Sequence, residues 1–240
     1  MLVPAEGLGE ARRDRLLKGI AARAGEDLRL APQLVTSTRG VKRDLVYEYP
    51  AAYPDPARLT AGVRLEMGIR GGPEPHESRP ITSYLATAAI ESGVAADEFD
   101  EFAPVSVLAL RPERTLVEKL ALLHDRASRL DDEPSALAGQ GRPVYDVFRL
   151  LRTDELREAI QVPGTVAALA ADVEAHSRRH GFASTPRPKA GFAASPAWAS
   201  GGEARSTMRE IYAAGRELVW GSFPTLEQCV SEIEAVGAYL

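Results

Sequence analysis

The chain has 240 residues, of which 45% are hydrophobic and 26% charged, and its formal net charge is −5. This length and composition are typical of a globular protein with one large domain or two small ones. The negative charge argues against a generic nucleic-acid coat protein, because binding to phosphate depends on clustered Lys and Arg. A local basic groove is the alternative to a solvated face for two groups: Arg39, Lys42 and Arg43, and Arg178, Arg179, Arg187 and Lys189.

Cysteine content and hydropathy indicate the compartment. The single cysteine, Cys229, excludes an internal disulfide framework and a cysteine-based zinc site, and it is expected in the core of the last helix. No apolar run reaches membrane-spanning length, and Arg12, Arg13 and Arg15 replace the apolar centre of a signal peptide. We therefore expect a cytoplasmic protein that does not enter a membrane.

The N-terminal stretch predicts a helix followed by a β-hairpin. Apolar residues at mostly helical spacing indicate an amphipathic helix over 8–24, with Gly25 as its stop signal. Alternating and β-branched residues in 28–36 and 41–49 flank Arg39-Gly40, a pattern typical of two paired strands.

A second strand-rich region follows. Residues 63–69 alternate between apolar and polar, so Glu66 is expected on the face opposite its apolar neighbours. Residues 71–80 are rich in Gly and Pro and predict a loop, and 104–110 predicts a short strand. Between them, 81–91 predicts a helix with these residues facing inward: Ile81, Tyr84, Leu85, Ala88 and Ala89.

The stretch 111–130 carries the clearest helical pattern of the chain. Its apolar stripe consists of Leu116, Leu120, Leu123, Ala127 and Leu130. Pro112 stands where the helix would begin, and Lys119 lies about sixty degrees round from Leu116, which places a cation beside the stripe.

A second helix is predicted over 141–152, and Asp146 falls in its expected first turn. Two helices joined by the polar loop 131–142 can fold back and bring Lys119 and Asp146 near one cleft. From spacing alone a simpler reading competes, in which the lysine is a solvated stem and the aspartate a partner of the helix dipole.

The remainder of the chain predicts further helices. They are expected over 154–160, 165–180, 204–219 and 225–239, with Trp220 and Phe223 packing the last corner. His176 and His180 lie four residues apart, but the pair lacks the glutamate of a His-Glu-x-x-His pattern, so a solvated basic helix end is favoured over a metal site. Residues 181–203 are dense in Gly, Pro, Ser and Ala and predict a long surface loop or mobile lid.

Two motifs carry a family resemblance. The run Arg-Thr-Leu-x-Glu-Lys-Leu at 114–120, followed by Tyr-Asp-x-x-Arg-Leu-Leu at 145–151, resembles the AbiEii/AbiGii-type nucleotidyltransferase toxins. The resemblance extends from about residue 10 to the C-terminus and is most specific in 111–152. It implies that Lys119 and Asp146 belong to the active site and that Arg114, with Lys119, contacts the bound nucleotide.

The resemblance also implies Mg²⁺ and an NTP as cofactors. The superfamily uses a Gly-Ser turn to grip the triphosphate and an Asp-x-Asp or Asp-x-Glu pair to hold the metal, which neutralises developing charge. The pair Gly221-Ser222 and Glu232-Ile233-Glu234 copies that spacing, but the glutamates fall in a predicted helix. We therefore expect that the chain begins just after the acidic strand, that catalysis is impaired, and that Glu66 is the best remaining metal-ligand candidate, although a solvent-facing strand residue is an equal alternative.

The sequence thus predicts an α+β protein. An incomplete polymerase-β-like nucleotidyltransferase portion with a mixed sheet would occupy residues 1–110, and a helical domain 111–240. The resemblance implies a toxin that transfers a nucleoside monophosphate from an NTP to an acceptor such as the tRNA 3′ end, with a cognate antitoxin as its partner. The alternatives are a non-catalytic binding or regulatory protein of the same fold and an unrelated helical interaction protein.

Overall fold

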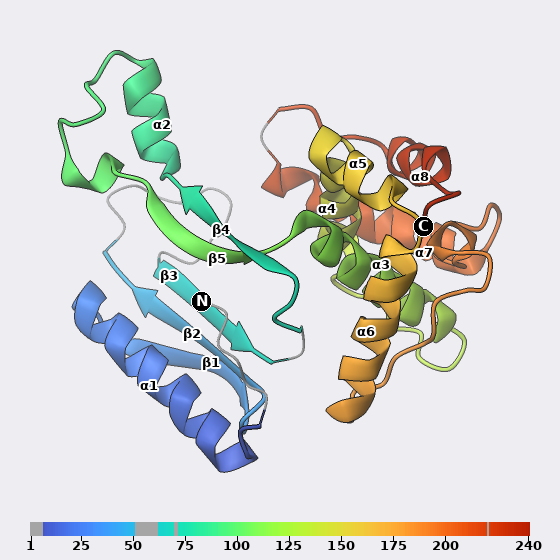
Figure 1. Ribbon diagram of the computed structural model, residues 1–240, viewed down its shortest axis with the longest axis horizontal. Helices are drawn as coiled ribbons and strands as arrows, with labels where there is room; N and C mark the ends of the chain where they lie inside the picture. Colours follow the sequence, from blue (N-terminus) through green and yellow to red (C-terminus); the bar gives the residue numbers. More distant parts are fainter. Residues whose placement is uncertain (1–6, 51–61, 70–71, 220) are drawn as a thin grey trace.

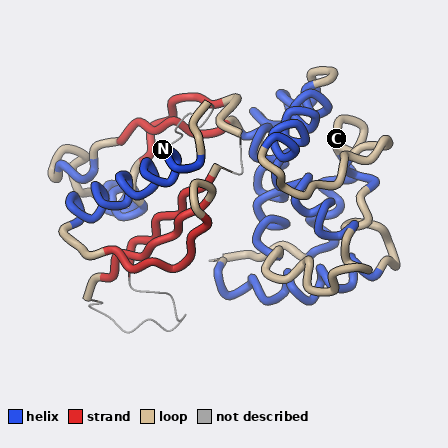
Figure 2. Tube along the Cα trace, turned by 90° about the horizontal axis from the view of Figure 1, so that it is seen from below, coloured by secondary structure: helices blue, strands red, loops and turns tan. Residues whose placement is uncertain are grey.

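The strands and most of the helices occupy different halves of the molecule. The computed structural model describes residues 7–50, 62–69, 72–219 and 221–240. The strands lie in one half together with α1 and α2, and the helices from α3 onward form the other half (Figures 1 and 2). This confirms the predicted α+β class. The division of the chain at residue 110 into two domains stays a prediction.

The first sheet is an antiparallel ladder in the order β1-β2-β3. Its strands are β1 (Pro32–Thr38), β2 (Lys42–Glu48) and β3 (Gly62–Gly68). The turn between β1 and β2 contains Gly40 at φ 63°, a left-handed conformation that glycine adopts without a steric penalty. The predicted hairpin around Arg39-Gly40 is therefore confirmed.

Helix α1 (Glu10–Leu28) covers one face of this sheet (Figure 1). The hydroxyl of Tyr47 donates a hydrogen bond to the carbonyl of Ala21 at 2.7 Å, and both residues join Leu45 in a small apolar cluster. The prediction that Gly25 stops the helix was wrong, because the helix continues to Leu28. Gly25 instead permits close packing, since a Cβ there would lie 3.0 Å from the carbonyl oxygen of Leu30.

The second sheet has two antiparallel strands, β4 (His76–Ile81) and β5 (Val105–Leu110). The prediction of a loop over 71–80 was therefore wrong for its second half. Pro80 is tolerated because a two-stranded ribbon consists of edge strands alone, where a missing backbone donor costs little. Helix α2 (Tyr84–Glu91) and the 3-10 turn η1 (Asp100–Phe102) connect the two strands.

The sides of α2 are reversed relative to the prediction. Tyr84 is 96% exposed and Leu85 is 73% exposed, whereas Ala86 is buried. The inward face predicted for 81–91 was wrong because, among the described residues, no other element packs over the apolar side of the helix. Apolar spacing predicted the helix but could not show whether anything covers it.

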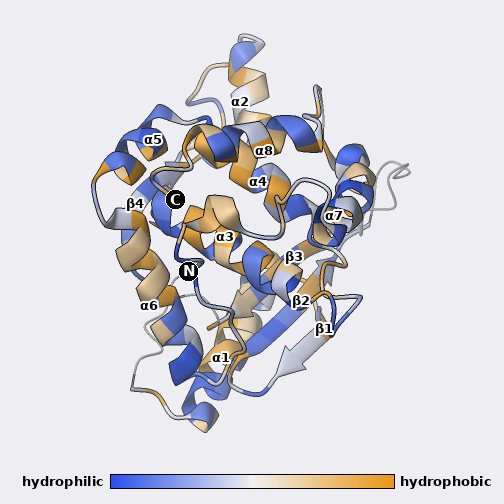
Figure 3. Cartoon of the chain, turned by 90° about the vertical axis from the view of Figure 1, so that its right-hand side faces the viewer, coloured by the Kyte–Doolittle hydropathy of each residue, from blue (hydrophilic) through white to orange (hydrophobic). Residues whose placement is uncertain are grey.

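The helical half contains the main core. Its elements are α3 (Pro112–Ser128), α4 (Gly141–Leu151), α5 (Asp154–Gln161), α6 (Thr165–Arg179), α7 (Glu203–Ala213), the 3-10 turn η3 (Ala214–Leu218) and α8 (Leu226–Ala235). Figure 3 shows α3 and α4 in the middle, surrounded by α5, α6, α7 and α8. All five residues of the predicted stripe on α3 are buried, which confirms that prediction.

The segment 181–203 is part of this core. Phe192, Ala197 and Trp198 are buried in the main apolar cluster, and the 3-10 turn η2 (Phe192–Ala194) lies against the C-terminus, where the Phe192 amide donates to the Leu240 carbonyl at 3.0 Å. The prediction of a surface loop or mobile lid was therefore wrong. Its composition indicated irregular backbone correctly, but two large side chains, Phe192 and Trp198, anchor that backbone in the core.

The last two helices close the same core. Cys229 of α8 is buried, as predicted, and its thiol donates a hydrogen bond to the hydroxyl oxygen of Tyr212 at 3.3 Å. The ring of Phe223 stacks between Tyr145 and Tyr212. Phe223 thus packs the corner as predicted, whereas Trp220 lies outside the described residues.

Candidate functional site

The two residues predicted to meet in a cleft do form a contact. The Nζ of Lys119 on α3 lies 2.7 Å from Oδ2 of Asp146 on α4, and each side chain is 26% exposed. The guanidinium of Arg142 lies 3.9 Å from the same carboxylate oxygen but is largely in solvent. Partial burial of the pair reduces screening by water, so the lysine charge is held at a defined position.

Asp146 is not in the first turn of its helix. Because α4 begins at Gly141, the aspartate falls in the second turn, and the prediction of a dipole partner was wrong. The carboxylate is instead occupied by a lysine from another helix. The structure brings the two residues together, and their action on a nucleotide stays a prediction.

Arg114 lies one helical turn and a half before Lys119 on α3 and is almost fully buried. Its Nε donates to Glu118 at 2.8 Å, and its Nη1 pairs with Asp172 on α6. Burial disfavours the charge, but the bonds to the two carboxylates outweigh it, and the pKa of Arg114 lies above its ordinary value. The remaining nitrogen, Nη2, is buried, has no hydrogen-bond partner among the described residues, and faces Gly72.

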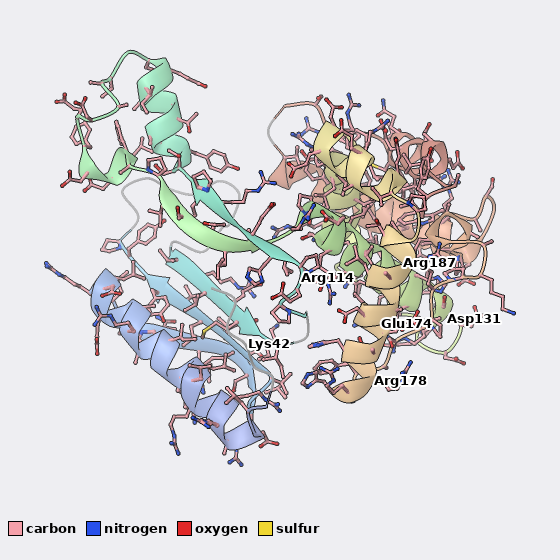
Figure 4. All side chains as sticks on the ribbon, in the orientation of Figure 1. Lys42, Arg114, Asp131, Glu174, Arg178 and Arg187 are labelled. Atoms are coloured by element: carbon pink, nitrogen blue, oxygen red, sulfur yellow. The ribbon has the colours of Figure 1, made fainter. Side chains whose placement is uncertain are left out.

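A cavity of about 310 Å³ lies between α3, α6 and the segment 183–187. Its lining includes Arg114, Lys119, Glu174, His176 and Thr185. Figure 4 shows Arg114 where the strands meet the helices and Glu174 on α6, with Arg187 beside it. The cavity is therefore lined by two basic residues of α3, Arg114 and Lys119, whereas Asp146 is not among its lining residues.

Hydrogen bonds fix the walls of this cavity. His176 on α6 donates through Nε2 to the carbonyl of Ile69, 2.9 Å away at the end of β3, which ties the helical half to the first sheet. Asp125 accepts from the amide and the hydroxyl of Thr185, at 2.9 and 3.0 Å. Arg187 is held by its own backbone amide, which donates to Glu174 at 2.8 Å.

Behind the cavity, His124 supports the segment that closes it. Its Nε2 lies 3.1 Å from the Pro186 carbonyl, which can only accept, so Nε2 carries the proton and Nδ1 accepts from the Ser195 hydroxyl at 3.0 Å. Burial lowers the pKa of His124 below its ordinary value. Both side chains are buried, so we assign them to structure.

Glu66 lies on β3, opposite Asp44 in the register of β2. As predicted, it is on the other face from Leu65 and Met67, which pack against the small cluster under α1. Its carboxylate, 60% exposed, accepts from Arg64 at 2.7 Å. Within the described residues no hydrogen bond or ion pair joins Glu66 to the cavity.

Asp44 was not singled out by sequence reasoning. It is fully buried beneath Lys42, whose Nζ lies 2.7 Å away, and Arg64, at 3.7 Å. Alternation along β2 put Asp44 on the polar face, but no sequence signal reveals that this face is covered. Asp172 was missed for a similar reason, because its partner Arg114 is far away in the sequence.

The remaining candidates are engaged in other contacts. The ring centroids of His176 and His180 lie 4.5 Å apart, but Nε2 of His176 is hydrogen-bonded to a backbone carbonyl. The described part of the chain contains no group of three metal-ligating side chains. Arg39 pairs with Glu10, and Lys42 with Asp44. These basic residues therefore serve local ion pairs. Glu232 and Glu234 lie in α8, as expected for a chance match to the acidic motif.

Comparison with known proteins decides the family. Residues 2–215 match the sequence model of the family described as nucleotidyl transferase AbiEii toxin, Type IV TA system. The chain belongs to the AbiEii toxin family. The curated proteins and the solved structures gave no significant match.

Membership of the AbiEii family confirms the resemblance carried by the two motifs around Lys119 and Asp146. It makes the chain a nucleotidyltransferase toxin of a type IV toxin–antitoxin system, and it implies an antitoxin as a partner. In the portion of the chain that the structure describes, no helix combines the length and hydropathy needed to cross a bilayer.

Proposed function

We propose that this AbiEii protein transfers a nucleoside monophosphate from an NTP to an RNA acceptor, such as the 3′ end of tRNA, in the cytoplasm. The observation that carries the proposal is the contact between Lys119 and Asp146 at the cavity that also contains Arg114. Phosphoryl-type transfer depends mainly on positioning and on neutralising phosphate charge, and a fixed cation beside a cavity can do both.

Lys119 contacts the phosphates of the nucleotide in this proposal. An ammonium group has three donors, and the Asp146 carboxylate uses one of them, so two remain for phosphate oxygens. Asp146 orients the lysine and is not consumed in the reaction.

Arg114 contributes differently. Two of its three nitrogens are taken by Glu118 and Asp172, whose two negative charges outweigh its own, so only Nη2 is left to contact a nucleotide. Its Nη2 faces Gly72, which follows β3. In our proposal Arg114 contacts the nucleotide through this nitrogen, and its ion pair with Asp172 holds α6 in place.

Mg²⁺ is the expected metal, and Glu66 is the side chain that would contribute to holding it. Mg²⁺ often takes one or two protein carboxylates and completes its shell with phosphate oxygens and water, so a single exposed glutamate fits a partial role. When bound, the ion would neutralise charge on the triphosphate. Glu66 would have to release Arg64, which now occupies its carboxylate.

The test is transfer of label from each α-labelled NTP to bulk tRNA in the presence of Mg²⁺. The Lys119→Ala variant should lose about 100-fold in rate, as expected when a donor to developing charge is removed. The matched control is Lys18→Ala, which breaks a comparable lysine–aspartate pair on the surface of α1. Labelling that survives Lys119→Ala intact would contradict the assigned role.

The same experiment separates transfer from binding. If the protein binds NTPs but labels no RNA under any of the four nucleotides, transfer is ruled out and a non-catalytic binding protein of the same fold is supported. If it labels an acceptor other than tRNA, the reaction stands and the acceptor is corrected.

A further inference from the structure

The segment from β4 to β5, residues 76–110, forms an arm that other elements barely cover. It consists of β4, α2, η1 and β5, and Figure 1 shows α2 and the loop after it projecting away from the helical half. A link between the arm and the helices is the ion pair of Arg79 with Glu155 on α5. Isolated two-stranded ribbons are only marginally stable in water, and this ribbon has little second layer to stabilise it.

Large apolar side chains are exposed along the whole arm. They are Ile81, Tyr84, Leu85, Ile90, Phe99, Val105 and Leu108, each more than a third exposed. Ile81 and Val105 face each other in the ribbon register, and Tyr84 and Leu85 are adjacent on α2. An apolar surface of this extent typically marks a contact with another macromolecule.

The arm also carries the net charge of the chain. It contains six carboxylates, Glu77, Glu91, Asp97, Glu98, Asp100 and Glu101, against one arginine, Arg79, for a formal charge of −5. Since the whole chain is also −5, the remainder is neutral. Phe99 lies directly between Glu98 and Asp100 in the sequence, and all three residues are exposed.

The exposed apolar side chains and the negative charge of the arm together indicate what kind of partner it can bind. An anionic surface repels nucleic acid and anionic lipid. Two arms in symmetric contact would place like charges opposite each other, which disfavours a second copy joined arm to arm. We propose that the arm is the docking surface for a basic protein segment, one that presents apolar side chains flanked by Lys or Arg. This surface is separate from the Lys119 cavity and does not depend on nucleotide transfer.

Two designed peptides of equal length test the proposal on the full chain. One alternates leucine with lysine, and the other alternates leucine with glutamate. The lysine peptide should bind, with an affinity that falls as salt is raised, and the glutamate peptide should not. Failure of the lysine peptide to bind would overturn the proposal.

Matched variants locate the contact. The Glu98→Lys/Asp100→Lys variant should weaken binding of the lysine peptide about tenfold, whereas Asp131→Lys/Asp132→Lys, which makes the same charge change at exposed positions of the helical half, should have little effect. Equal weakening by both variants would mean that only net charge matters, and the arm would then not be a docking surface.

A second pair tests the apolar part. Tyr84→Ser/Leu85→Ser should also weaken binding about tenfold, and Val162→Ser/Tyr239→Ser, at exposed apolar positions elsewhere, should not. Because Tyr84 and Leu85 are exposed, the folded state should be unaffected, which circular dichroism can verify. A dimer in sedimentation analysis that dissociates on Tyr84→Ser/Leu85→Ser would overturn the proposal in favour of a second copy.

Discussion

The helical half and the arm place their large apolar side chains in opposite environments. In the helical half, α3 and α4 bury Leu116, Leu120 and Val147 completely, whereas the arm leaves Tyr84 and Leu85 largely in water. The Lys119–Asp146 pair joins α3 to α4, two helices that contribute to the main core. The candidate site is therefore built on well-packed helices, whereas the apolar surface of the arm is exposed and available to another molecule.

The first sheet is an intermediate case. Helix α1 covers one of its faces through a cluster that includes Ala21, Leu45 and Tyr47, so it has a core, but a small one. A graded series of mutational effects should follow, since the free energy lost on truncation depends on the number of atoms packed around the side chain.

The largest effect is expected from truncating the same residue type in the two contrasted regions. Leu123→Ala, in the core of the helical half, should lower the free energy of unfolding by about 2–5 kcal/mol. Leu85→Ala in the arm should change it by less than about 0.5 kcal/mol, because this side chain is exposed. Urea denaturation of both variants measures the contrast, and equal losses would show that the arm is covered in solution.

The free energy of unfolding should depend on pH through His124, a buried residue of the helical half. The buried His124 has a pKa below its ordinary value of 6.5, so the unfolded chain binds its proton more tightly than the folded chain. The stability contributed by neutral His124 is therefore complete above pH 6.5 and is lost as the pH falls below it, by at most about 1.4 kcal/mol per pH unit. Unfolding free energies measured from pH 7.5 to 5.5 should slope less in His124→Gln; an unchanged slope would rule out this group as the source.

The smallest effects are expected at two glycines of α1, where substitution by alanine should change the free energy of unfolding in opposite directions. Gly19→Ala should stabilise the protein by about 0.5–1 kcal/mol, because alanine favours helix and its Cβ would meet nothing within 4 Å. Gly25→Ala should destabilise it, since its Cβ would approach the Leu30 carbonyl oxygen and the Tyr47 ring. Thermal unfolding of the two variants tests whether α1 packs on the sheet as described, and stabilisation by both would contradict it.

Local patterns predicted much of this fold. The stripe on α3, the hairpin at Gly40 and the outward face of Glu66 depend on neighbours within a few residues, and spacing reports such relations well. The contact between Lys119 and Asp146 was one of two interpretations that the sequence allowed, because consecutive helices joined by a polar loop often pack against each other.

The wrong predictions concern which surfaces are buried by other parts of the chain, and local sequence patterns do not encode this. Periodicity showed that α2 has an apolar side but not that this side lacks a neighbour. Composition showed that 181–203 is irregular but not that Phe192 and Trp198 anchor it in the core. Asp172 and Asp44 escaped notice because their importance depends on Arg114 and on Lys42 with Arg64, contacts that only the folded chain reveals.

Direct binding of NTPs tests the central claim, that the Lys119 site holds nucleotide phosphates, without requiring turnover. Titration calorimetry with each NTP and Mg²⁺ should show at least a tenfold weaker affinity for Lys119→Ala, about 1.4 kcal/mol, with Lys18→Ala matching the unmodified protein. Equal affinity of Lys119→Ala and the unmodified protein for every nucleotide would contradict the account.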